Sequence, residues 1–448
     1  MEQAPLLPEM PEPSAPGARP PTRPEAARVA RPVRDQAEWA PRSLDQALAD
    51  DHPARAIWAF VERLDLAAFY AEVRAVLDGP GRPPADPRVL LALWVYATSR
   101  GVGSARRLAE LCGTDDAYRW LRGGVPVNYH QLADFRSANR AALDELLTRI
   151  LAAMMAGGLV TLERVSQDGV RLRAAAGSAS FRRKARLEEH LAAARAQVAA
   201  LAAEAEDPGA ASRRERAARE RAARERAERL ERALAELPKV EAIKERQRKK
   251  LARGKREQVS EARASSTDPE ARVRKMADGG FRPALNAQLA TDTESQVIVG
   301  VAVTNQGSDG GLAAPMEEQV ADRAGRHPGE YLIDGAFATL GDIVALGRRG
   351  VTAYTPARPP KGERRQADPT LPRPTDPPEV AAWRARMATD EAKATYKERA
   401  AASECVNAQV EGRYGLRQLR VRGADKALAV LLLVAVAHNL LRWIALAA

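Results

Sequence analysis

Three acidic residues that lie far apart in the sequence have the types and settings of a metal-binding site. Asp168 stands in the middle of residues 165–173 (VSQDGVRLR), a predicted strand, and Asp334 ends the apolar segment 331–334. An Asp inside a strand is costly unless it is solvated, paired or bound to a metal. Glu404 lies on a predicted helix near the C-terminus. Each acid alone is better explained as a capping or ion-paired residue, whereas the three together indicate a site.

The chemistry of such a set follows from its ligand type. Carboxylates on different strands of one sheet can converge, and a carboxylate from a helix then completes an all-oxygen pocket. Such a pocket suits Mg²⁺ or Mn²⁺ better than zinc. Two such ions, about 3.5–4 Å apart, activate a water or a 3′-hydroxyl and stabilise the leaving oxygen during phosphodiester cleavage and transfer. The three acids therefore predict metal-dependent chemistry on a nucleic acid.

The composition also favours a polyanionic partner. The 448 residues include 70 Lys and Arg against 59 Asp and Glu, which gives a formal net charge of +11. Such a balance most often serves nucleic-acid binding. The two cysteines, Cys112 and Cys405, form no CxxC pair, and no HExxH motif occurs, which argues against a zinc site. We expect a cytoplasmic, nucleoid-associated protein without a signal peptide.

The first 157 residues, which precede all three acids, are predicted to contain a disordered tail and a helical domain. Residues 1–41 are rich in Pro and Ala without apolar periodicity, which predicts a disordered tail. Residues 42–157 carry short amphipathic segments between Gly and Pro residues, and we predict a helical DNA-binding domain in which Asp86 and Ser104 cap helices. Short helices with sharp turns are typical of helix-turn-helix DNA binders and equally of other helical bundles.

Strand patterns occur in residues 158–181 and 259–448, which we assign to one catalytic domain. Side-chain alternation places Ser166 and Asp168 on one face of their strand and Gln167 on the other. Further strands are predicted at 284–291, 296–303, 331–334 and 351–355, with helices at 311–324, 339–348 and from 389 to about 409. This order predicts an α/β fold, a mixed sheet with flanking helices.

Two segments interrupt this domain. Residues 182–258, dominated by Ala, Arg, Glu and Leu, predict a charged helical hairpin whose second helix ends at Pro238. Its charges are better explained by a solvated surface than by contact with DNA or a second subunit. Residues 357–388 contain a predicted Pro-rich loop. The apolar segment 427–437 continues into polar residues, so it predicts a buried core helix and no membrane span.

Short motifs along the chain resemble one known family through their order and number. In the N-terminal part they are residues 86–96, 101–104, 118–121, 128–130 and 134–136; in the C-terminal part they are residues 167–174, 279–288, 292–294, 333–337, 399–408, 421–423 and 437–440. On these motifs, most of residues 42–445 resembles the DDE transposases of bacterial insertion sequences, with an InsH-type helical N-terminal domain.

The resemblance implies a ribonuclease H-like catalytic domain that hydrolyses transposon ends and transfers strands. It implies that Asp168, Asp334 and Glu404 are the catalytic residues and hold Mg²⁺ or Mn²⁺. It also implies that the helical domain helps to bind the terminal inverted repeats, and that the protein is a homodimer because two ends are synapsed. We expect contacts with double-stranded DNA from Arg171, Arg173, Tyr396, Arg399, Arg413, Arg422, His130 and Arg136.

The third acid is where the sequence departs from the family pattern. Related enzymes often show Tyr, two residues, Arg, three residues, Glu, six residues and Lys. Tyr396 and Arg399 fit this pattern, but Glu404 comes one residue late and Glu411 stands where Lys is expected. Glu404 and Glu411 share a helical face, so Glu411 is a rival. The spacing of Asn407 and of a later Arg-Gly pair favours Glu404.

Two functions from different classes are compatible with the sequence. The first is a transposase that cleaves and joins DNA by metal-dependent phosphoryl transfer. The second is a catalytically inactive DNA-binding protein derived from a transposase. A coiled-coil scaffold based on residues 182–258 leaves the three acids unexplained.

Overall fold

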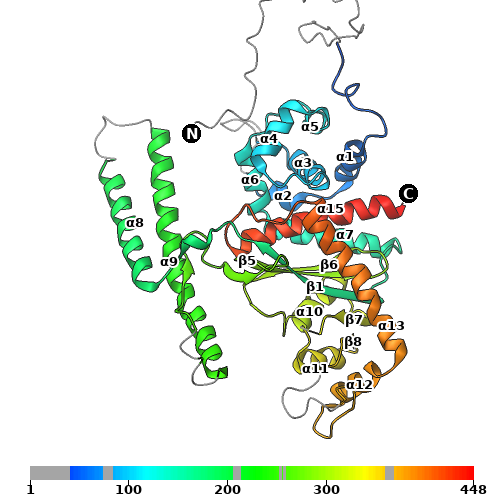
Figure 1. The fold of residues 1–448 in the computed structure, drawn as a ribbon. Helices are drawn as coiled ribbons and strands as arrows, with labels where there is room; N and C mark the ends of the chain where they lie inside the picture. The colour runs from blue at the N-terminus through cyan, green and yellow to red at the C-terminus, as the bar shows by residue number, and fades with distance from the viewer. Residues whose placement is uncertain are drawn as a thin grey trace, which may run out of the picture. The chain divides into compact units, whose positions relative to one another are not determined.

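The computed structural model describes residues 41–73, 84–204, 213–251, 255, 259–335, 337–358 and 368–447. The chain divides into two compact units, residues 1–43 and residues 44–448. Every described helix and strand belongs to the second unit (Figure 1). The disorder predicted for residues 1–41 concerns a segment that, apart from Pro41, lies outside the described residues.

Short helices precede the sheet in the chain. They are α1 (Pro53–Arg63), α2 (Ala67–Ala71), α3 (Pro87–Ser99), α4 (Ala105–Thr114), α5 (Asp116–Arg122), α6 (Tyr129–Ala138) and α7 (Arg140–Ala156). The predicted caps of α3 and α4 are confirmed, because Asp86 accepts from the Arg88 N–H at 2.7 Å and Ser104 from the Arg107 N–H at 3.4 Å. These bonds satisfy N–H groups that have no partner within the helix, which fixes where each helix begins. Nearly every residue of α3 is buried, as its all-round apolar composition predicts.

A mixed sheet forms around its central strand β1. Its strands are β1 (Arg164–Arg173), β4 (Arg272–Lys275), β5 (Phe281–Asp292), β6 (Ile298–Thr304), β7 (Glu330–Ile333) and β8 (Thr352–Tyr354). On one side β1 pairs antiparallel with β5, which pairs antiparallel with β4 and β6. On the other side β1 pairs in parallel with β7, and β7 in parallel with β8. The predicted α/β class with N-terminal helices and a mixed sheet is confirmed.

The alternation predicted for β1 is present. The Ser166 hydroxyl contacts the Ser403 hydroxyl, and Asp168 on the same face contacts Asn407. The amide of Gln167 instead donates to the Leu312 carbonyl, just before α10 (Ala313–Ala324). The strand therefore directs Asp168 towards the C-terminal helical segment and Gln167 towards α10.

Two strand pairs and one helix of the structure were not predicted from the sequence. Strand β4 has charged residues at three of its four positions, so it lacks the apolar alternation of a strand. The pair β2 (Phe181–Arg182) and β3 (Ala264–Ser265) has only two residues in each strand. The loop predicted for 357–388 is wrong over its last part, where α12 (Pro378–Met387) forms. Pro378 suits a first helical turn, and Trp383 is buried.

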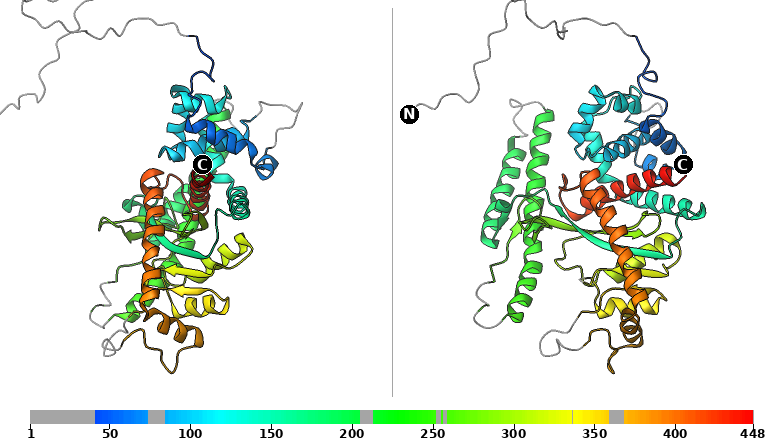
Figure 2. Two further views of the ribbon diagram at one scale, coloured as in Figure 1. Left: turned by 90° about the vertical axis from the view of Figure 1, so that its right-hand side faces the viewer. Right: turned by 45° about the vertical axis from the view of Figure 1, so that its right-hand side comes forward.

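The predicted helix from residue 389 to about 409 is confirmed, but it is not uniform. The helix α13 (Asp390–Arg399) continues through a π-helical turn (Ala400–Glu404), α14 (Cys405–Ala408) and a second π-helical turn (Gln409–Arg413). This long helical segment passes along one side of the sheet (Figure 2). Asp168 points towards this segment, because its carboxylate accepts from the Asn407 amide. A π-helical turn holds one residue more than an α-helical turn, and such turns are frequent at functional sites.

The C-terminal helix α15 (Ala424–Ala447) lies in the core, where it contacts α3, α6, α7 and β6. Within the described part of the chain it is the one helix long and apolar enough to cross a membrane, and most of that apolar stretch is buried by other elements. The Asn439 amide bonds both the N–H and the carbonyl of Ile298 in β6, at 2.9 and 2.8 Å. Apolar burial and this amide pairing hold α15 against the sheet, as expected for a core helix.

His438 adds a second polar attachment between α15 and the sheet. Burial lowers its pKa from 6.5 to about 4, so the imidazole is neutral at physiological pH. Its Nε2 lies 2.8 Å from the Gln296 carbonyl oxygen, which can only accept, so Nε2 carries the proton. Nδ1 then accepts from the Tyr414 hydroxyl at 3.0 Å. The histidine thus links α15 to the turn before β6 and to the end of the long helical segment.

Residues 182–258 contain the predicted helical hairpin, α8 (Lys184–Glu204) and α9 (Arg213–Lys250). The two helices share an apolar cluster that includes Leu187 and Leu230. The predicted end at Pro238 is wrong, because α9 continues through it to Lys250. The buried neighbours Leu237 and Val240 offset the hydrogen bond that proline cannot make.

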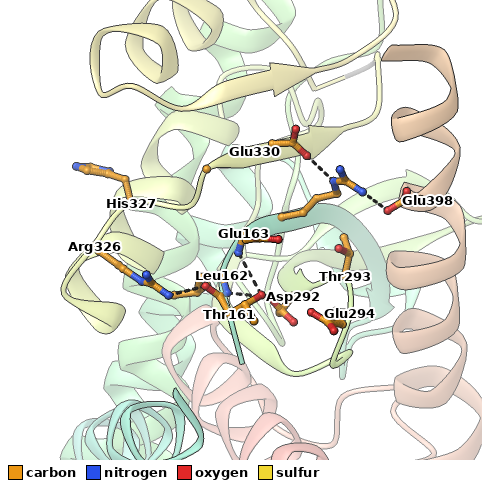
Figure 3. Close-up of a pocket in the computed structure, with 12 residues that line it drawn as sticks. Thr161, Leu162, Glu163, Asp292, Thr293, Glu294, Arg326, His327, Glu330 and Glu398 are labelled. Carbon is orange, nitrogen blue, oxygen red and sulfur yellow. Dashed lines mark hydrogen bonds and ion pairs between the residues drawn. The ribbon is translucent and has the colours of Figure 1, made fainter. Parts of the chain in front are cut away.

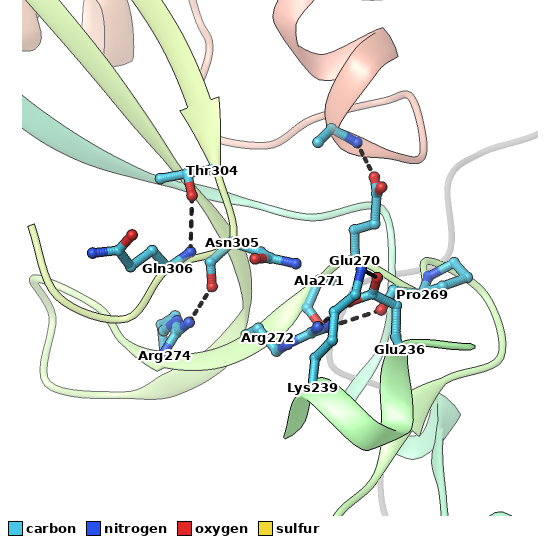
Figure 4. A network of polar contacts seen from close by, with 11 residues as sticks. Glu236, Lys239, Pro269, Glu270, Ala271, Arg272, Arg274, Thr304, Asn305 and Gln306 are labelled. Atoms are coloured by element: carbon cyan, nitrogen blue, oxygen red, sulfur yellow. Dashed lines mark hydrogen bonds and ion pairs between the residues drawn. The ribbon is translucent and has the colours of Figure 1, made fainter. Parts of the chain in front are cut away.

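A buried ion pair attaches the hairpin to the sheet (Figure 4). Arg272 of β4 pairs with Glu236 of α9, and both side chains are 9% exposed. Arg272 also donates to the Pro269 carbonyl at 2.8 Å, and Lys239 donates to Glu236 at 2.6 Å. Because breaking one partner of a buried pair leaves an uncompensated charge, this contact fixes the base of the hairpin.

Two glycine turns meet where the N-terminal helices approach the C-terminal segment. Gly101 and Gly415 have φ values of +70° and +68°, which side chains other than glycine rarely adopt. A Cβ on Gly415 would lie 2.7 Å from the Gly101 carbonyl oxygen, and a Cβ on Gly101 would lie 3.1 Å from the Arg413 carbonyl oxygen. The two backbones can approach this closely only without side chains.

We therefore predict that Gly415→Ala lowers the free energy of unfolding by about 2–4 kcal/mol, because it combines a left-handed backbone with a backbone clash. Gly412→Ala is the matched control, since a Cβ at Gly412 meets open space in a helical conformation. That control should change stability by no more than about 1 kcal/mol. Urea unfolding of both variants measures the difference, and equal effects would contradict the close approach.

Candidate active site

The register of the sheet places Asp168 and Asp334 on neighbouring strands. The pairing of β1 with β7 ends with Gln167 opposite Ile333. One residue further along, the same register sets Asp168 beside Asp334, across the spacing of about 4.8 Å between neighbouring strands. Asp334 directly follows β7 and is half-buried.

One cavity of about 560 Å³ brings the predicted acids together. Asp168, Asp334 and Glu404 all line it, and so does the rival Glu411. The cavity is open to solvent, and the side chain of Glu404 is 65% exposed whereas that of Asp168 is 22% exposed. The acids therefore differ in environment, with Asp168 set deep and Glu404 near the mouth.

The environment of Asp168 disfavours its charged form. Burial raises its pKa above the ordinary value, and the nearby carboxylates of Asp334 and Asp309 add to this rise. The Gly169 N–H, which donates to Asp168 Oδ1 at 2.8 Å, and the charge of Arg399 act in the opposite direction. A group of acids in one partly buried cavity requires a positive charge nearby.

Arg399 supplies a positive charge to this cavity. Its guanidinium lies 3.6 Å from Asp168 Oδ2 and 3.6 Å from Glu404 Oε1. It also lies over the Tyr396 ring, 5.8 Å from the ring centroid. The Asn407 amide donates to the same Asp168 oxygen at 3.1 Å.

The π-helical turn accounts for the unusual spacing of the third acid. Glu404 follows Arg399 by five residues, whereas the expected pattern of related enzymes often has four. The π-helical turn at Ala400–Glu404 uses i→i+5 geometry, so the fifth residue returns to the face that the fourth occupies in an α-helix. Arg399 and Glu404 are accordingly in contact. Glu404 can thus lie on the side of the helix that faces Asp168, although it comes one residue later in the sequence than the pattern predicts.

The carboxylates of the cavity are suitable ligands for a divalent cation, but their present positions are not those of ligands of a single ion. Carboxylate oxygens are the ligands that Mg²⁺ and Mn²⁺ prefer. Among the residues that the structure describes, however, no three or more His, Cys, Asp or Glu side chains are grouped as ligands of one metal ion. The group between Asp168 and Glu404 is the Arg399 guanidinium. The donor set therefore suits the cation chemically, and direct coordination by all three acids would require Arg399 to move.

Several polar residues of the cavity were not singled out as site residues from the sequence. Asp309 accepts from the amides of Asn286 at 2.5 Å and Gln288 at 2.9 Å, and it lines the cavity with Lys275. Asp309 lies in a Ser-Asp-Gly-Gly segment, whose composition indicates only a turn. The polar Asn286 and Gln288, which alternate with apolar residues in the middle of β5, are the signal that could have drawn attention to this region.

The residues predicted to contact DNA fall into different settings. Arg171 lines the acid cavity and donates to the Lys275 carbonyl at 2.5 Å, while Arg173 is exposed at the end of β1. Arg413 is exposed, and Tyr396 is half-buried beneath Arg399.

Arg422 lines a separate cavity of about 100 Å³ with Arg229 and Arg232 of α9. Burial lowers the pKa of Arg229, and the charge of Arg422 lowers it further. Both hairpin arginines and the segment before α15 therefore present positive charge to one small cavity. Glu236 and Glu270 line the same cavity, and Glu236 belongs to the ion-pair network that holds the hairpin (Figure 4).

The two predicted DNA contacts in the N-terminal helices differ in exposure. His130 is exposed and its ring lies 3.9 Å from that of Tyr129. Arg136 is only 6% exposed, lies over the Trp94 ring and donates to the Gly103 carbonyl at 2.5 Å. Arg136 therefore faces the core, which its position on a helix did not reveal, and its contact with DNA stays a prediction.

A larger cavity of about 790 Å³ lies at the other end of β1 (Figure 3). Several of its charged groups are paired: Arg164 bonds Glu330 and Glu398, and Asp292 accepts from the Leu162 N–H at 3.2 Å. None of the three predicted acids lines it. The smaller cavity is the candidate active site, because all three predicted acids line it.

Comparison with protein families found two matches. The family model described as a transposase domain (DUF772) matches residues 42–138, and the model described as a transposase DDE domain matches residues 374–444. The second match contains Glu404, whereas neither contains Asp168 or Asp334. No curated protein and no solved structure matches the chain.

The two matches, in this order along the chain, identify a transposase of the DDE class. More particularly, they support a DDE transposase of an insertion sequence, a protein of DNA recombination and transposition.

The raised pKa of Asp168 predicts a gain in stability on its neutralisation. Because the folded-state pKa lies above the unfolded value of 3.8, ionisation of Asp168 costs the folded state free energy at neutral pH. Asp168→Asn should therefore raise the thermal midpoint at pH 7.5, by on the order of 1–3 °C in EDTA. The gain should disappear as the pH falls through the folded-state pKa, where wild-type Asp168 becomes protonated.

Glu404→Gln is the control for this measurement, because its exposed side chain should change the thermal midpoint little at either pH. A gain for Asp168→Asn that is the same at pH 7.5 and at acidic pH would rule out the electrostatic cause.

Proposed function

We propose that this protein binds the terminal inverted repeats of an insertion sequence and catalyses metal-dependent DNA cleavage and strand transfer. The observation that carries the proposal is the shared cavity of Asp168, Asp334 and Glu404, in which Asp168 lies on β1 and Asp334 directly follows the adjacent parallel strand β7. The match to a transposase DDE domain supports the same chemistry.

The sheet supports a ribonuclease H-like catalytic domain. It has an antiparallel hairpin on one side of β1 and two parallel strands on the other, with Asp168 on the central strand. We assign residues 158–181 and 259–448 to this domain, residues 42–157 to the DNA-binding domain and residues 182–258 to the helical insertion.

Asp168, Asp334 and Glu404 are the residues that would hold Mg²⁺ or Mn²⁺ in this proposal. A bound divalent cation supplies Lewis acidity to the scissile phosphate and lowers the pKa of an attacking water or hydroxyl. The chain's own groups have separate roles: Asn407 and the Gly169 N–H orient the Asp168 carboxylate, since each donates to a different oxygen. Arg399 balances the carboxylate charges and lies close enough to the cavity to contact a DNA phosphate.

Basic side chains around the cavity provide the DNA surface. Arg171 and Lys275 line the cavity itself, Arg173 and Arg413 are exposed, and Arg422 lies beside the insertion. We infer that the insertion takes part in DNA binding through α9. Because two transposon ends must be brought together, we infer a homodimer acting on DNA in the cytoplasm.

One observation favours a second candidate function. Arg399 lies between Asp168 and Glu404, and the described acids are not grouped as ligands of one metal ion. A catalytically inactive DNA-binding protein derived from a transposase would have this arrangement permanently. The two candidates differ in whether the acids are needed for any reaction on DNA.

We predict that the full-length protein nicks DNA carrying the element's ends in Mg²⁺, and that Asp168→Asn lowers nicking at least about 10³-fold, because the innermost carboxylate is lost. DNA binding measured by fluorescence anisotropy should remain within about two-fold of the wild type. Nicking retained by Asp168→Asn would remove the site assignment, and no nicking by the wild type on its own ends would favour the inactive alternative.

The two candidates for the third acid make opposite predictions. Glu404 contacts Arg399 and lies one helical turn before Asn407, so Glu404→Gln should lower nicking by at least about 10²-fold. Glu411→Gln, which alters another carboxylate of the same cavity, should keep activity within about three-fold. The reverse order of effects in the same nicking assay would assign the role to Glu411.

A further inference from the structure

A small cavity lies at the seam between the N-terminal helices and the segment before α15. Its volume is about 70 Å³, enough for several waters or one tetrahedral oxyanion. Residues of α3, of the turn before α4, of α6, of the C-terminal segment and of α15 line it. It is separate from the acid cavity, with which it shares no lining residue.

The charge of this seam cavity is one-sided. Arg136 and Arg420 line it, and no Asp or Glu does. Among the residues that the structure describes, neither arginine has a carboxylate partner. Burial and then the charge of Arg420 lower the pKa of Arg136 to about 10, so the Arg136 side chain remains positive at neutral pH. Two cations therefore face one another around a space without a counter-charge.

Arg136 is held in place but is not fully satisfied. Its guanidinium lies 4.6 Å from the Trp94 ring centroid and donates to the Gly103 carbonyl, while its Nε has no hydrogen-bond partner. The residue is only 6% exposed. Burying a charge without a paired opposite charge costs free energy, and aromatic stacking offsets only part of that cost.

The walls of the cavity are rigid. Gly101 and Gly415 line it, and their backbones are in the close contact described above. Tyr414, which also lines it, is fixed by its hydrogen bond to His438. Arg136 is therefore presented from a wall that is already formed, whereas Arg420 is exposed at the surface.

We propose that the seam cavity is an oxyanion site, in which a phosphate group binds between Arg136 and Arg420 and joins the N-terminal helices to the C-terminal segment. The phosphate can come from inorganic phosphate or from the DNA backbone. Arg420 would close on it from the exposed side, and Arg136 would neutralise it from the buried side. Only the DNA source rests on the proposed function.

The test is thermal unfolding of the full-length protein in EDTA, with inorganic phosphate against chloride at equal ionic strength. Phosphate should raise the thermal midpoint by on the order of 1–3 °C through binding to the folded state. Arg420→Gln should remove at least half of this shift, and Arg136→Gln should act in the same direction if it folds. Arg417→Gln, an exposed arginine outside the cavity, is the matched control and should keep the shift.

Equal shifts in wild type, Arg420→Gln and Arg417→Gln would overturn the proposal, as would the absence of any shift specific to phosphate. A second measurement identifies the source. If a DNA phosphate enters the cavity, Arg420→Gln should reduce the salt dependence of duplex binding by about one counterion relative to Arg417→Gln. If free phosphate is the ligand, the two variants should show the same salt dependence. Neither result depends on nicking activity, so failure of the catalytic proposal would be seen separately.

Discussion

The burial of α15 is the constraint on which the rest of the structure depends. This helix contacts N-terminal helices on one side and β6 on the other, so a single apolar element serves two parts of the core. Its polar residues make the arrangement specific: Asn439 bonds the backbone of Ile298, and neutral His438 links Gln296 to Tyr414. Apolar burial supplies the larger free energy, whereas these directional bonds fix the register of the helix against the sheet.

The candidate site, in contrast, groups side chains of like charge, which repel one another. A parallel register sets two aspartates side by side, and the long helical segment adds a glutamate. Such a cluster is unfavourable in a partly buried cavity, and the raised pKa of Asp168, caused first by burial and then by the neighbouring carboxylates, expresses that cost. Arg399 relieves it within the chain itself. The negative charge of the acids can therefore be neutralised either by the Arg399 guanidinium or by a cation that the acids bind from solution.

Local patterns in the sequence were sufficient for much of the architecture. The caps at Asp86 and Ser104, the alternation along β1 and the apolar C-terminal helix depend on near neighbours, and each is present. What the sequence did not reveal depends on distant contacts. Helix α9 continues through Pro238 because buried neighbours hold it, and Arg136 turns inward onto Trp94, a residue 42 positions earlier. The shared cavity of the acids was predictable as a convergence, but the Arg399 guanidinium between two of them was not.

The π-helical turn before Glu404 bears on how such a site changes through evolution. One extra residue in a regular helix would rotate everything after it by about 100° and turn the acid away from its partners. In this chain the widened turn absorbs the extra residue, so the helix resumes in phase. A turn of this kind would confine a one-residue insertion to itself, and the residues on either side would keep their orientation. Homologues that differ by one residue in this interval can thus share one three-dimensional arrangement, which a motif search with fixed spacing would not detect.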